Sequence, residues 1–256
     1  MDRLQLDKNA KLTGRVYFKD EVMWLGLSGS GASFTFDGTK LVLNLKGDNI
    51  AVGENPIDYA RIAVYVDGKR VVDEMINCAE KEITIIDRTE SAKSVVEIIK
   101  LSESPMSAVG IEAFAEGSAE ALPEKPLKIE FIGDSITCGY GVDDEDENHQ
   151  FTTATEDVTK AYAYKTAKAL DAEYSMFSAS GYGIVSGYTE GDEPISEQTI
   201  PQFYCSYGFS RGNFAGTAPQ DIPWDFSKYV PQIIVINLGT NDDSYCRDYK
   251  DRQAVF

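Results

Sequence analysis

The chain has 256 residues, enough to bury a sizeable core and slightly more than one typical domain holds, so two domains are expected. Its 42 acidic and 24 basic side chains give a formal net charge of −18, which repels nucleic-acid phosphates and anionic membrane surfaces. No apolar run approaches the roughly 18 residues that a membrane helix needs. We therefore expect a neutral partner, with neither nucleic acid nor a membrane as partner.

The N-terminus and the cysteines bear on the compartment. The first residues, MDRLQLDKNAKLTGRV, lack the apolar core of a signal peptide, which favours the cytoplasm, and a mature secreted form is the alternative. The four cysteines show no C-x-x-C spacing, so neither a zinc site nor a redox motif is indicated. We expect reduced thiols at Cys78, Cys138, Cys205 and Cys246.

Residues 12 to about 115 follow a β pattern. Two alternating runs, SFTFDGTKLVLNL (33–45) and RIAVYVDGKRVV (61–72), each contain an Asp-Gly pair. These pairs predict hairpin turns at Asp37-Gly38 and Asp67-Gly68. Short strands at close spacing predict a jelly-roll β-sandwich over residues 1–117, followed by a linker at 118–127 in which two prolines stand among small and acidic residues. Further strands of this sandwich are predicted at 82–87, 94–101 and 107–115.

The pattern changes to alternating strands and helices after residue 127. LKIEFIGDS (127–135) and EYSMFSAS (173–180) are typical of buried strands, and residues 156–172 between them predict a helix with its N-cap at Thr155. PQIIVINLGTND (231–242) is almost continuously apolar up to Leu238, as in a strand covered on both faces. Strand, helix and strand in this order predict a parallel α/β layer over residues 128–256.

Each of these three strands ends in small and polar residues. Because the carboxyl ends of parallel strands meet at one edge of a sheet, GDSITCG (133–139), SASGYG (178–183) and LGTNDD (238–243) are expected to lie together. Ser135, at a turn beside unpaired backbone N–H groups, suits a nucleophile. Gly181 offers a backbone N–H and Asn241 a side-chain NH₂ to one oxyanion. Each stretch alone is as typical of an ordinary turn or helix cap, so the combination carries the interpretation.

GDSIT around Ser135, SGYG around Gly181 and GTND around Asn241 resemble blocks I, II and III of the GDSL, or SGNH, hydrolase superfamily. The resemblance implies serine ester hydrolysis on a flavodoxin-like three-layer α/β/α fold. It implies Ser135 as nucleophile, with the Ser135 and Gly181 N–H groups and Asn241 as the oxyanion hole. From LTGRVYF (12–18) to DFSKYVPQIIVINLGTND (225–242), the chain resembles the second family of carbohydrate esterases. That family removes acetyl groups from plant polysaccharides such as xylan and glucomannan, and has a jelly-roll domain ahead of its hydrolase domain.

The resemblance also implies a catalytic base, a histidine in an Asp-x-x-His block after the third block, and this sequence contains no such block. The one histidine, His149, lies in the acidic stretch DDEDENHQF (143–151), and we interpret it as a loop residue rather than as the base. Losing a triad member leaves catalysis of only about 10³- to 10⁴-fold over water. We therefore expect a truncated product or partial sequence, with a hydrolase domain that is incomplete at its C-terminus, and impaired activity of this chain alone.

The leading functional prediction is a carbohydrate O-acetyl esterase whose partner is an acetylated oligo- or polysaccharide. The alternatives are a non-catalytic carbohydrate-binding protein, because the sandwich resembles binding modules, and an SGNH esterase or lipase of other specificity. Aromatic contacts to sugar rings are expected among Tyr140, Tyr182 and Trp224, and the long connection 187–224 is expected to recognise substrate. The acidic run 143–147 lacks the alternating ligands and glycine of an EF-hand, so we predict no metal and no cofactor.

Overall fold

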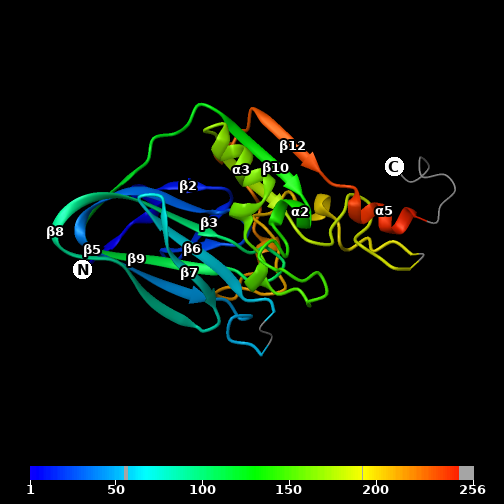
Figure 1. Cartoon of the computed structure of the whole chain (residues 1–256), viewed down its shortest axis with the longest axis horizontal. Helices are drawn as coiled ribbons and strands as arrows, with labels where there is room; N and C mark the ends of the chain where they lie inside the picture. Colours follow the sequence, from blue (N-terminus) through cyan, green and yellow to red (C-terminus); the bar gives the residue numbers. More distant parts are fainter. Residues whose placement is uncertain (55–56, 192, 248–256) are drawn as a thin grey trace.

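The computed structural model describes residues 1–54, 57–191 and 193–247. The first half of the chain forms an antiparallel sheet of nine strands, and the second half forms a parallel sheet of three strands with short helices around it (Figure 1). The predicted hydrolase domain runs to residue 256, so its end, 248–256, lies outside the described residues. None of the described helices is long and apolar enough to cross a membrane.

Long, curved strands dominate the antiparallel sheet, in which β5, β8 and β9 have 17, 21 and 13 residues. The strand order is β3-β4-β9-β5-β8-β6-β7, with β1 paired to β9 and β2 to β5. The two strands predicted at 82–87 and 94–101 are one continuous strand, β8. The elements of this part are β1 (Asp2–Leu4), α1 (Leu6–Asn9), β2 (Lys11–Thr13), β3 (Val16–Lys19), β4 (Val22–Leu25), β5 (Gly31–Gly47), β6 (Ala60–Val66), β7 (Lys69–Ile76), β8 (Glu80–Lys100) and β9 (Val109–Ala121).

A bulge in β5 turns both halves of this strand toward one apolar core. Between Gly38 and Lys40 the pairing with β9 shifts by one position, so Thr39 is an extra residue on β5. The buried positions change from even to odd numbers at this point, and the strand bends around the core. Figure 1 shows β5 and β8 curving together. The core residues of β5 are Ala32, Phe34, Phe36, Leu41, Leu43 and Leu45.

One predicted hairpin turn is confirmed and the other is wrong. Asp67 and Gly68 join β6 to β7 with φ angles of 50° and 79°, as a type I′ turn requires. Asp37 and Gly38 instead lie inside β5, beside the bulge. A side chain at Gly38 would lie 2.3 Å from the carbonyl oxygen of Glu116 on β9, so glycine serves the close approach of two strands there.

The parallel sheet has the order β11-β10-β12, in which the first strand lies between the second and the third. This is the order of a flavodoxin-like sheet, whose ligands bind at the carboxyl ends of the first and third strands. The corresponding place here is the end of β10 and β12. The elements of this part are β10 (Lys128–Gly133), α2 (Ser135–Cys138), η1 (Thr153–Thr155), η2 (Val158–Lys160), α3 (Tyr162–Ala169), β11 (Glu173–Ser178), α4 (Ile200–Phe203), η3 (Pro219–Asp221), η4 (Phe226–Lys228), β12 (Ile233–Asn237) and α5 (Thr240–Cys246).

The helix predicted over 156–172 is wrong at both ends, because only α3 is α-helical. The Asp157 carboxylate accepts the Thr159 N–H at 2.9 Å and starts the short 3₁₀ helix η2. Ala161 then takes an extended conformation, with a ψ of 160°, before α3 begins. The predicted cap, Thr155, is the last residue of η1. Local hydrogen bonds to the Asp157 side chain thus compete with the helical pattern of the sequence.

The expectation that the third strand is covered on both faces is wrong for the described residues. Within them, β12 is an edge strand that pairs with β10 alone. Its Ile233, Ile234 and Ile236 side chains are 43%, 54% and 64% exposed. An apolar run shows that a strand can be buried, and it does not determine the position of that strand in the sheet.

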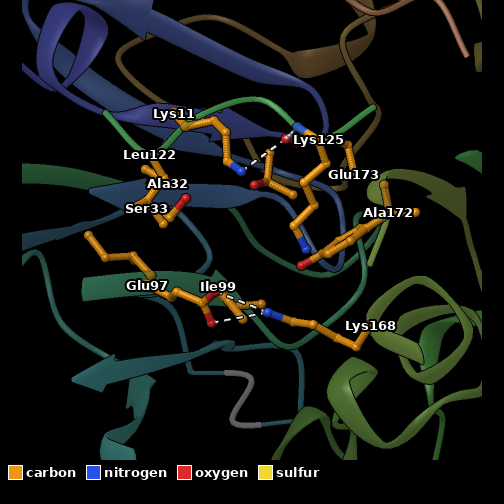
Figure 2. Close-up of a pocket in the computed structure, with 13 residues that line it drawn as sticks. Lys11, Ala32, Ser33, Glu97, Ile99, Leu122, Lys125, Lys168, Ala172 and Glu173 are labelled. Carbon is orange, nitrogen blue, oxygen red and sulfur yellow. Dashed lines mark hydrogen bonds and ion pairs between the residues drawn. The ribbon is translucent and has the colours of Figure 1, made fainter. Parts of the chain in front are cut away.

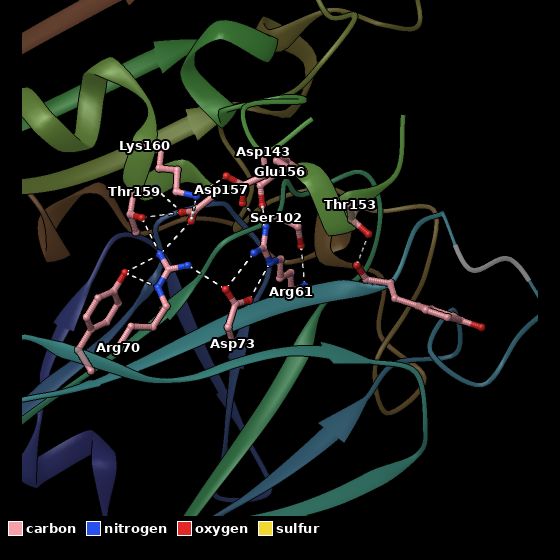
Figure 3. A network of polar contacts seen from close by, with 12 residues as sticks. Arg61, Arg70, Asp73, Ser102, Asp143, Thr153, Glu156, Asp157, Thr159 and Lys160 are labelled. Atoms are coloured by element: carbon pink, nitrogen blue, oxygen red, sulfur yellow. Dashed lines mark hydrogen bonds and ion pairs between the residues drawn. The ribbon is translucent and has the colours of Figure 1, made fainter. Parts of the chain in front are cut away.

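Two arginines of the sandwich bind acidic groups of the α/β part (Figure 3). Arg61 on β6 pairs with Asp73 at 2.8 Å and with Asp143 at 2.9 Å. Arg70 on β7 pairs at 2.9 Å with Asp157, which is fully buried. The pairs with Asp143 and Asp157 fix the sandwich against the segment that runs from α2 to α3, and Asp73 on β7 orients Arg61 from within the sandwich.

The two parts also meet around a small hollow of about 70 Å³ (Figure 2). Lys11 on β2 pairs with Glu173 at 2.9 Å, and Lys168 on α3 pairs with Glu97 on β8 at 3.0 Å. The ion pairs cross this hollow from both sides. We interpret it as an ion-paired seam between the two parts.

Candidate active site

Ser135 is positioned by the turn from β10 into α2. The Asp134 carboxylate accepts the Ile136 N–H at 3.1 Å and caps the helix. A side chain at Gly133 would lie 2.0 Å from Thr137 Oγ1, so glycine lets this turn close. The resulting geometry leaves Ser135 half-buried at the carboxyl end of β10.

Gly181 lies in the loop after β11 and has a φ of 80°, in the left-handed region that favours glycine. A methyl group added at this position would meet no atom within 4 Å, so the backbone is open to a ligand. The loop is held by Asp242, which is fully buried and whose carboxylate accepts three successive N–H groups, of residues 184–186, at 2.6 to 3.1 Å. Sequence reasoning assigned no role to Asp242, although it is the last residue of GTND.

Asn241 lies in the first turn of α5, directly after the Gly239-Thr240 turn. Its Nδ2 donates a hydrogen bond to the backbone carbonyl of Tyr182 at 2.8 Å. This bond ties the loop that carries Gly181 to the end of β12. A primary amide has two N–H bonds, so the other one can serve an oxygen in the space between these elements.

Ser135, Gly181, Asn241 and Tyr140 line one hollow of about 500 Å³. The structure therefore brings the three predicted strand ends together, at the edge where a flavodoxin-like sheet binds its ligands. The sandwich supplies part of the wall of the hollow, through Ile57, Asp58 and Met106. This contribution lies outside the sequence motifs, because those residues are close to Ser135 only in the folded chain.

Two aromatic side chains form one wall of the hollow. Tyr140 stacks on Phe151 with ring centroids 3.8 Å apart and 10° between the ring planes. Tyr140 is 47% exposed, so part of its surface stays available to a ligand. Tyr188, which is 49% exposed, is a further aromatic lining residue. Neither Phe151 nor Tyr188 was singled out from the sequence, since nothing local distinguishes them from packing residues.

The other two predicted sugar contacts do not line this hollow. The Tyr182 ring packs against Phe209 with a centroid distance of 4.9 Å, and its backbone carbonyl, rather than its ring, meets Asn241. Trp224 lies with its ring centroid 5.3 Å from the guanidinium carbon of Arg15. A role of Tyr182 or Trp224 in substrate binding stays a prediction.

A charged pair lies at the rim. Arg211 Nη1 is 3.3 Å from Asp58 Oδ2, and the two residues are 153 positions apart in the chain. The Arg211 side chain is 62% exposed, whereas Asp58 is buried. Both side chains can form hydrogen bonds with sugar hydroxyls.

His149 is not brought to Ser135. Its Nδ1 lies 2.9 Å from Asp144 Oδ1, and its side chain is 65% exposed. It lines a neighbouring acidic hollow that shares Tyr140 and Phe151 with the first one. The Asp144 pKa is lowered, first by the Asp146 N–H and then by the histidine.

Two family models match consecutive parts of the chain. Residues 12–126 match the N-terminal domain of carbohydrate esterase family 2, and residues 129–255 match the GDSL-like lipase and acylhydrolase model. The chain belongs to the GDSL hydrolases of carbohydrate esterase family 2. Membership confirms the resemblance of the three blocks and the architecture of a β-sandwich followed by an α/β hydrolase domain.

Among curated proteins, the chain is similar to cellulase/esterase CelE of Acetivibrio thermocellus, with 33% identity over 85% of this chain and 24% of that protein. It is also similar to an acetylxylan esterase/glucomannan deacetylase of Cellvibrio japonicus, with 28% identity over 93% of this chain and 62% of that protein. The chain thus spans less than two thirds of these relatives. A family two carbohydrate esterase from Clostridium thermocellum, solved in complex with cellohexaose, matches with a TM-score of 0.77 and 28% identity, over 96% of this chain and 70% of that one.

Proposed function

We propose that this family 2 chain is a carbohydrate O-acetyl esterase that removes acetyl groups from plant polysaccharides such as xylan or glucomannan. The observation that carries the proposal is that Ser135, Gly181 and Asn241 line one hollow at the end of β10 and β12. The relative that is named for acetylxylan and glucomannan, and the cellohexaose complex of another, support a polysaccharide as substrate.

In the proposed reaction, Ser135 Oγ attacks the acetyl carbonyl carbon. The carbonyl oxygen becomes an oxyanion that accepts hydrogen bonds from the Ser135 and Gly181 N–H groups and from Asn241 Nδ2. The sugar hydroxyl leaves with a proton as the acetyl-serine ester forms, and water cleaves that ester to acetate. Asp242 contacts no substrate in this scheme, and its role is to hold the loop after Gly181.

The resemblance gives the proton transfer to a histidine, and we assign this role to none of the 256 residues. His149 pairs with Asp144 and lines the neighbouring hollow, so its ring is held by another partner. Deprotonation of the Ser135 hydroxyl is therefore the step that we expect to limit the rate of this chain alone.

The sugar ring of the substrate is proposed to lie against Tyr140, which Phe151 supports by stacking. Arg211 and Asp58 at the rim would then bind ring hydroxyls. A neutral acetylated sugar also avoids repulsion by a chain whose net charge is −18.

Acetate release from acetylated xylo- and manno-oligosaccharides tests the proposal. Ser135→Ala removes the attacking oxygen, so the release that passes through the acetyl-serine ester should be lost and only the residual catalysis of binding and oxyanion stabilisation should remain, while the circular dichroism spectrum stays unchanged. Ser91→Ala, a change at an exposed serine of the sandwich, is the matched control. If Ser135→Ala releases acetate as fast as the parent chain, the proposal is wrong.

The position of His149 outside the hollow favours a second candidate, a non-catalytic carbohydrate-binding protein. Isothermal titration with acetylated and deacetylated xylo-oligosaccharides distinguishes the two functions. Binding of both ligands without any acetate release would identify the binding protein, whereas Ser135-dependent release identifies the esterase.

A further inference from the structure

The connection between β8 and β9 leaves the sandwich and is buried in the α/β part. Every residue from Leu101 to Ser107 is buried. Leu101 O accepts the Val158 N–H at 3.3 Å, next to α3, and Pro105 O accepts the Arg211 N–H at 2.9 Å, at the rim of the hollow. A segment that belongs to the sandwich by sequence therefore packs against the elements that carry the candidate active site.

Glu103 is the residue of this connection that contacts the loop carrying Gly181. Its side chain is fully buried, and its Oε2 accepts the Ser180 N–H at 2.5 Å. Ser180 directly precedes Gly181. The bond spans 77 positions of sequence, so it holds a loop of the hydrolase part with a carboxylate from the sandwich.

The charged and titratable groups that interact with Glu103 are Lys100, Cys138, Glu156 and, at longer range, Arg211, Tyr140 and Tyr182. The Glu103 N–H donates to Glu156 Oε2 at 3.0 Å, and Lys100 Nζ donates to the Glu103 carbonyl at 3.0 Å. One ligand atom each of Glu103, Cys138 and Glu156 lies within 4.8 Å of the others. Of the hydrogen bonds to Glu103 Oε2, the one from the Ser180 N–H is the shortest, at 2.5 Å, and the Cys138 thiol lies at 3.9 Å.

The charge states follow from burial. Burial raises the pKa of Glu103 and, well above its usual range, the pKa of Glu156, which the Glu103 charge raises further. Burial also raises the pKa of the Cys138 thiol, so it is neutral. The nearby Lys100 ammonium opposes both shifts, because its charge lowers the pKa of Glu103 and of Glu156.

We propose that Glu103 is a positioning residue of the sandwich: its carboxylate fixes the Ser180 N–H and so directs the Gly181 N–H into the hollow. The catalytic meaning of this contact rests on the proposed function, in which the Gly181 N–H binds the oxyanion. The physical contact itself does not depend on that function. A buried side-chain oxygen that accepts a backbone N–H holds that N–H in place, because loss of the bond leaves a buried donor without a partner. Without this hydrogen bond Ser180 is no longer held, and the next residue, Gly181, can adopt many backbone conformations.

The first test is amide hydrogen exchange at Ser180 and Gly181 in the full chain. Glu103→Asp keeps the carboxyl group and withdraws the acceptor by one methylene, and we expect exchange at Ser180 to become at least about tenfold faster. Glu103→Gln keeps an acceptor oxygen at full reach, so exchange should stay close to that of the parent. Glu156→Gln is the matched control, because it changes the same buried cluster without contacting Ser180.

The second test is the affinity for phenylboronic acid, which adds to a serine to form a tetrahedral anion. The Ser135 Oγ–B bond forms, the hydroxyl proton passes to water, and a boronate oxygen occupies the oxyanion position. The dissociation constant should rise about tenfold in Glu103→Asp and stay near that of the parent in Glu103→Gln and Glu156→Gln. Removal of a complete oxyanion donor costs about 10²- to 10³-fold in rate, and a displaced donor costs less.

The outcomes separate the two proposals. If Ser135→Ala binds phenylboronic acid as well as the parent does, the proposed function fails, whatever happens at Glu103. If Ser180 exchange is the same in Glu103→Asp and the parent, or if Glu103→Gln and Glu103→Asp lose boronate affinity equally, the positioning inference is wrong. Faster Ser180 exchange together with a Gln rescue supports it.

Discussion

At the residue scale, two adjacent side chains after β12 have opposite hydrogen-bonding tasks. Asn241 donates from Nδ2, to the Tyr182 carbonyl at 2.8 Å and, in the proposed reaction, to the oxyanion. Asp242 only accepts, from the backbone of residues 184–186. The two side chains have the same shape, so exchanging an amide for a carboxylate changes the direction of the hydrogen bond without changing the packing.

Asn241→Asp should lower Ser135-dependent hydrolysis of 4-nitrophenyl acetate by at least about 10²-fold. The introduced carboxylate cannot donate to the oxyanion and repels it, while the volume of the side chain stays the same. The rate is measured after subtraction of the rate of Ser135→Ala. Asn213→Asp, at an exposed position of the loop 204–218, is the control and should keep the parent rate. Equal rates for Asn241→Asp and the parent would remove Asn241 from the oxyanion hole.

Gly181 allows a comparison between two glycines of similar conformation. Gly181 and Gly141 have φ angles of 80° and 63°, and a methyl group at either would meet no atom within 4 Å. Each glycine-to-alanine change should therefore destabilise the chain by roughly 1 to 2 kcal/mol, because an L-residue is strained in this region. Only Gly181→Ala should also reduce phenylboronic acid binding, since its methyl group enters the hollow beside Ser135.

Urea unfolding and boronate titration of both variants check this prediction. A similar loss of boronate affinity in Gly141→Ala would mean that backbone strain, rather than the position of the methyl group, is responsible.

At the element scale, the sequence predicts the strands and turns that depend on local residue patterns. Strands β10, β11 and β12 and the hairpin at Asp67-Gly68 follow from apolar runs and turn residues. The three strand ends could be predicted to meet because parallel strands present their carboxyl ends at one edge. The polar motifs at those ends therefore gave the candidate site without any tertiary information.

What the sequence could not predict depends on partners that are distant along the chain. The sequence pattern places residues 156 and 157 in a helix. Besides the local bond from the Thr159 N–H to Asp157, Glu156 accepts a bond from Glu103 and Asp157 pairs with Arg70, and both residues lie outside α3. The same holds for the wall of the hollow, where Asp58 meets Arg211 across 153 positions. Such contacts arise only once two domains have packed together.

The buried position of Glu156 predicts a specific pH dependence. Its pKa is raised in the folded chain, chiefly by burial, so the folded state binds a proton more tightly than the unfolded state does. The contribution of Glu156 to the free energy of unfolding is thus fully present below about pH 4.5, the usual value, and is lost as the pH rises toward the raised pKa. Glu156→Gln removes this titration.

The difference in the free energy of unfolding between Glu156→Gln and the parent should therefore grow in favour of the variant between pH 5 and pH 8. Urea unfolding at four pH values in this range measures it. The neighbouring Glu103, Lys100 and Arg61 are present in both proteins, so most of their own titration cancels in the difference. Parallel stability curves for the two proteins would show that Glu156 does not titrate with a raised pKa.

At the scale of the whole molecule, charged side chains are buried where the two parts meet. Arg15, between β2 and β3, is fully buried under the α/β part. Its Nη1 donates to the carbonyls of Tyr204 and Ser206 at 2.6 and 2.5 Å, and its guanidinium lies 4.4 Å from the ring centroid of Phe177. Its Nη2 is 3.6 Å from Glu130 Oε1 on β10. Burial lowers the Arg15 pKa to about 10, which still leaves it charged at neutral pH.

Arg15→Met should destabilise the chain by about 3 to 5 kcal/mol, because it leaves the buried Glu130 without its counter-charge. Arg3→Met is the control: its pairs with Glu21 and Glu112 are partly exposed, and such pairs contribute about 1 kcal/mol or less. Adding Glu130→Gln to Arg15→Met should recover part of the loss, since it removes the unpaired charge and keeps an acceptor for the Tyr204 hydroxyl.

Urea unfolding followed by tryptophan fluorescence and by circular dichroism measures these effects. Trp24 lies in β4 of the sandwich and Trp224 beside Arg15 in the α/β part, so fluorescence reports on both parts. Because Arg15 fills a space that only the packed parts create, its loss should move the transitions of both probes together. If Arg15→Met instead splits unfolding into two separate transitions with the sandwich unchanged, the two parts are independently stable and the buried arginine only docks them.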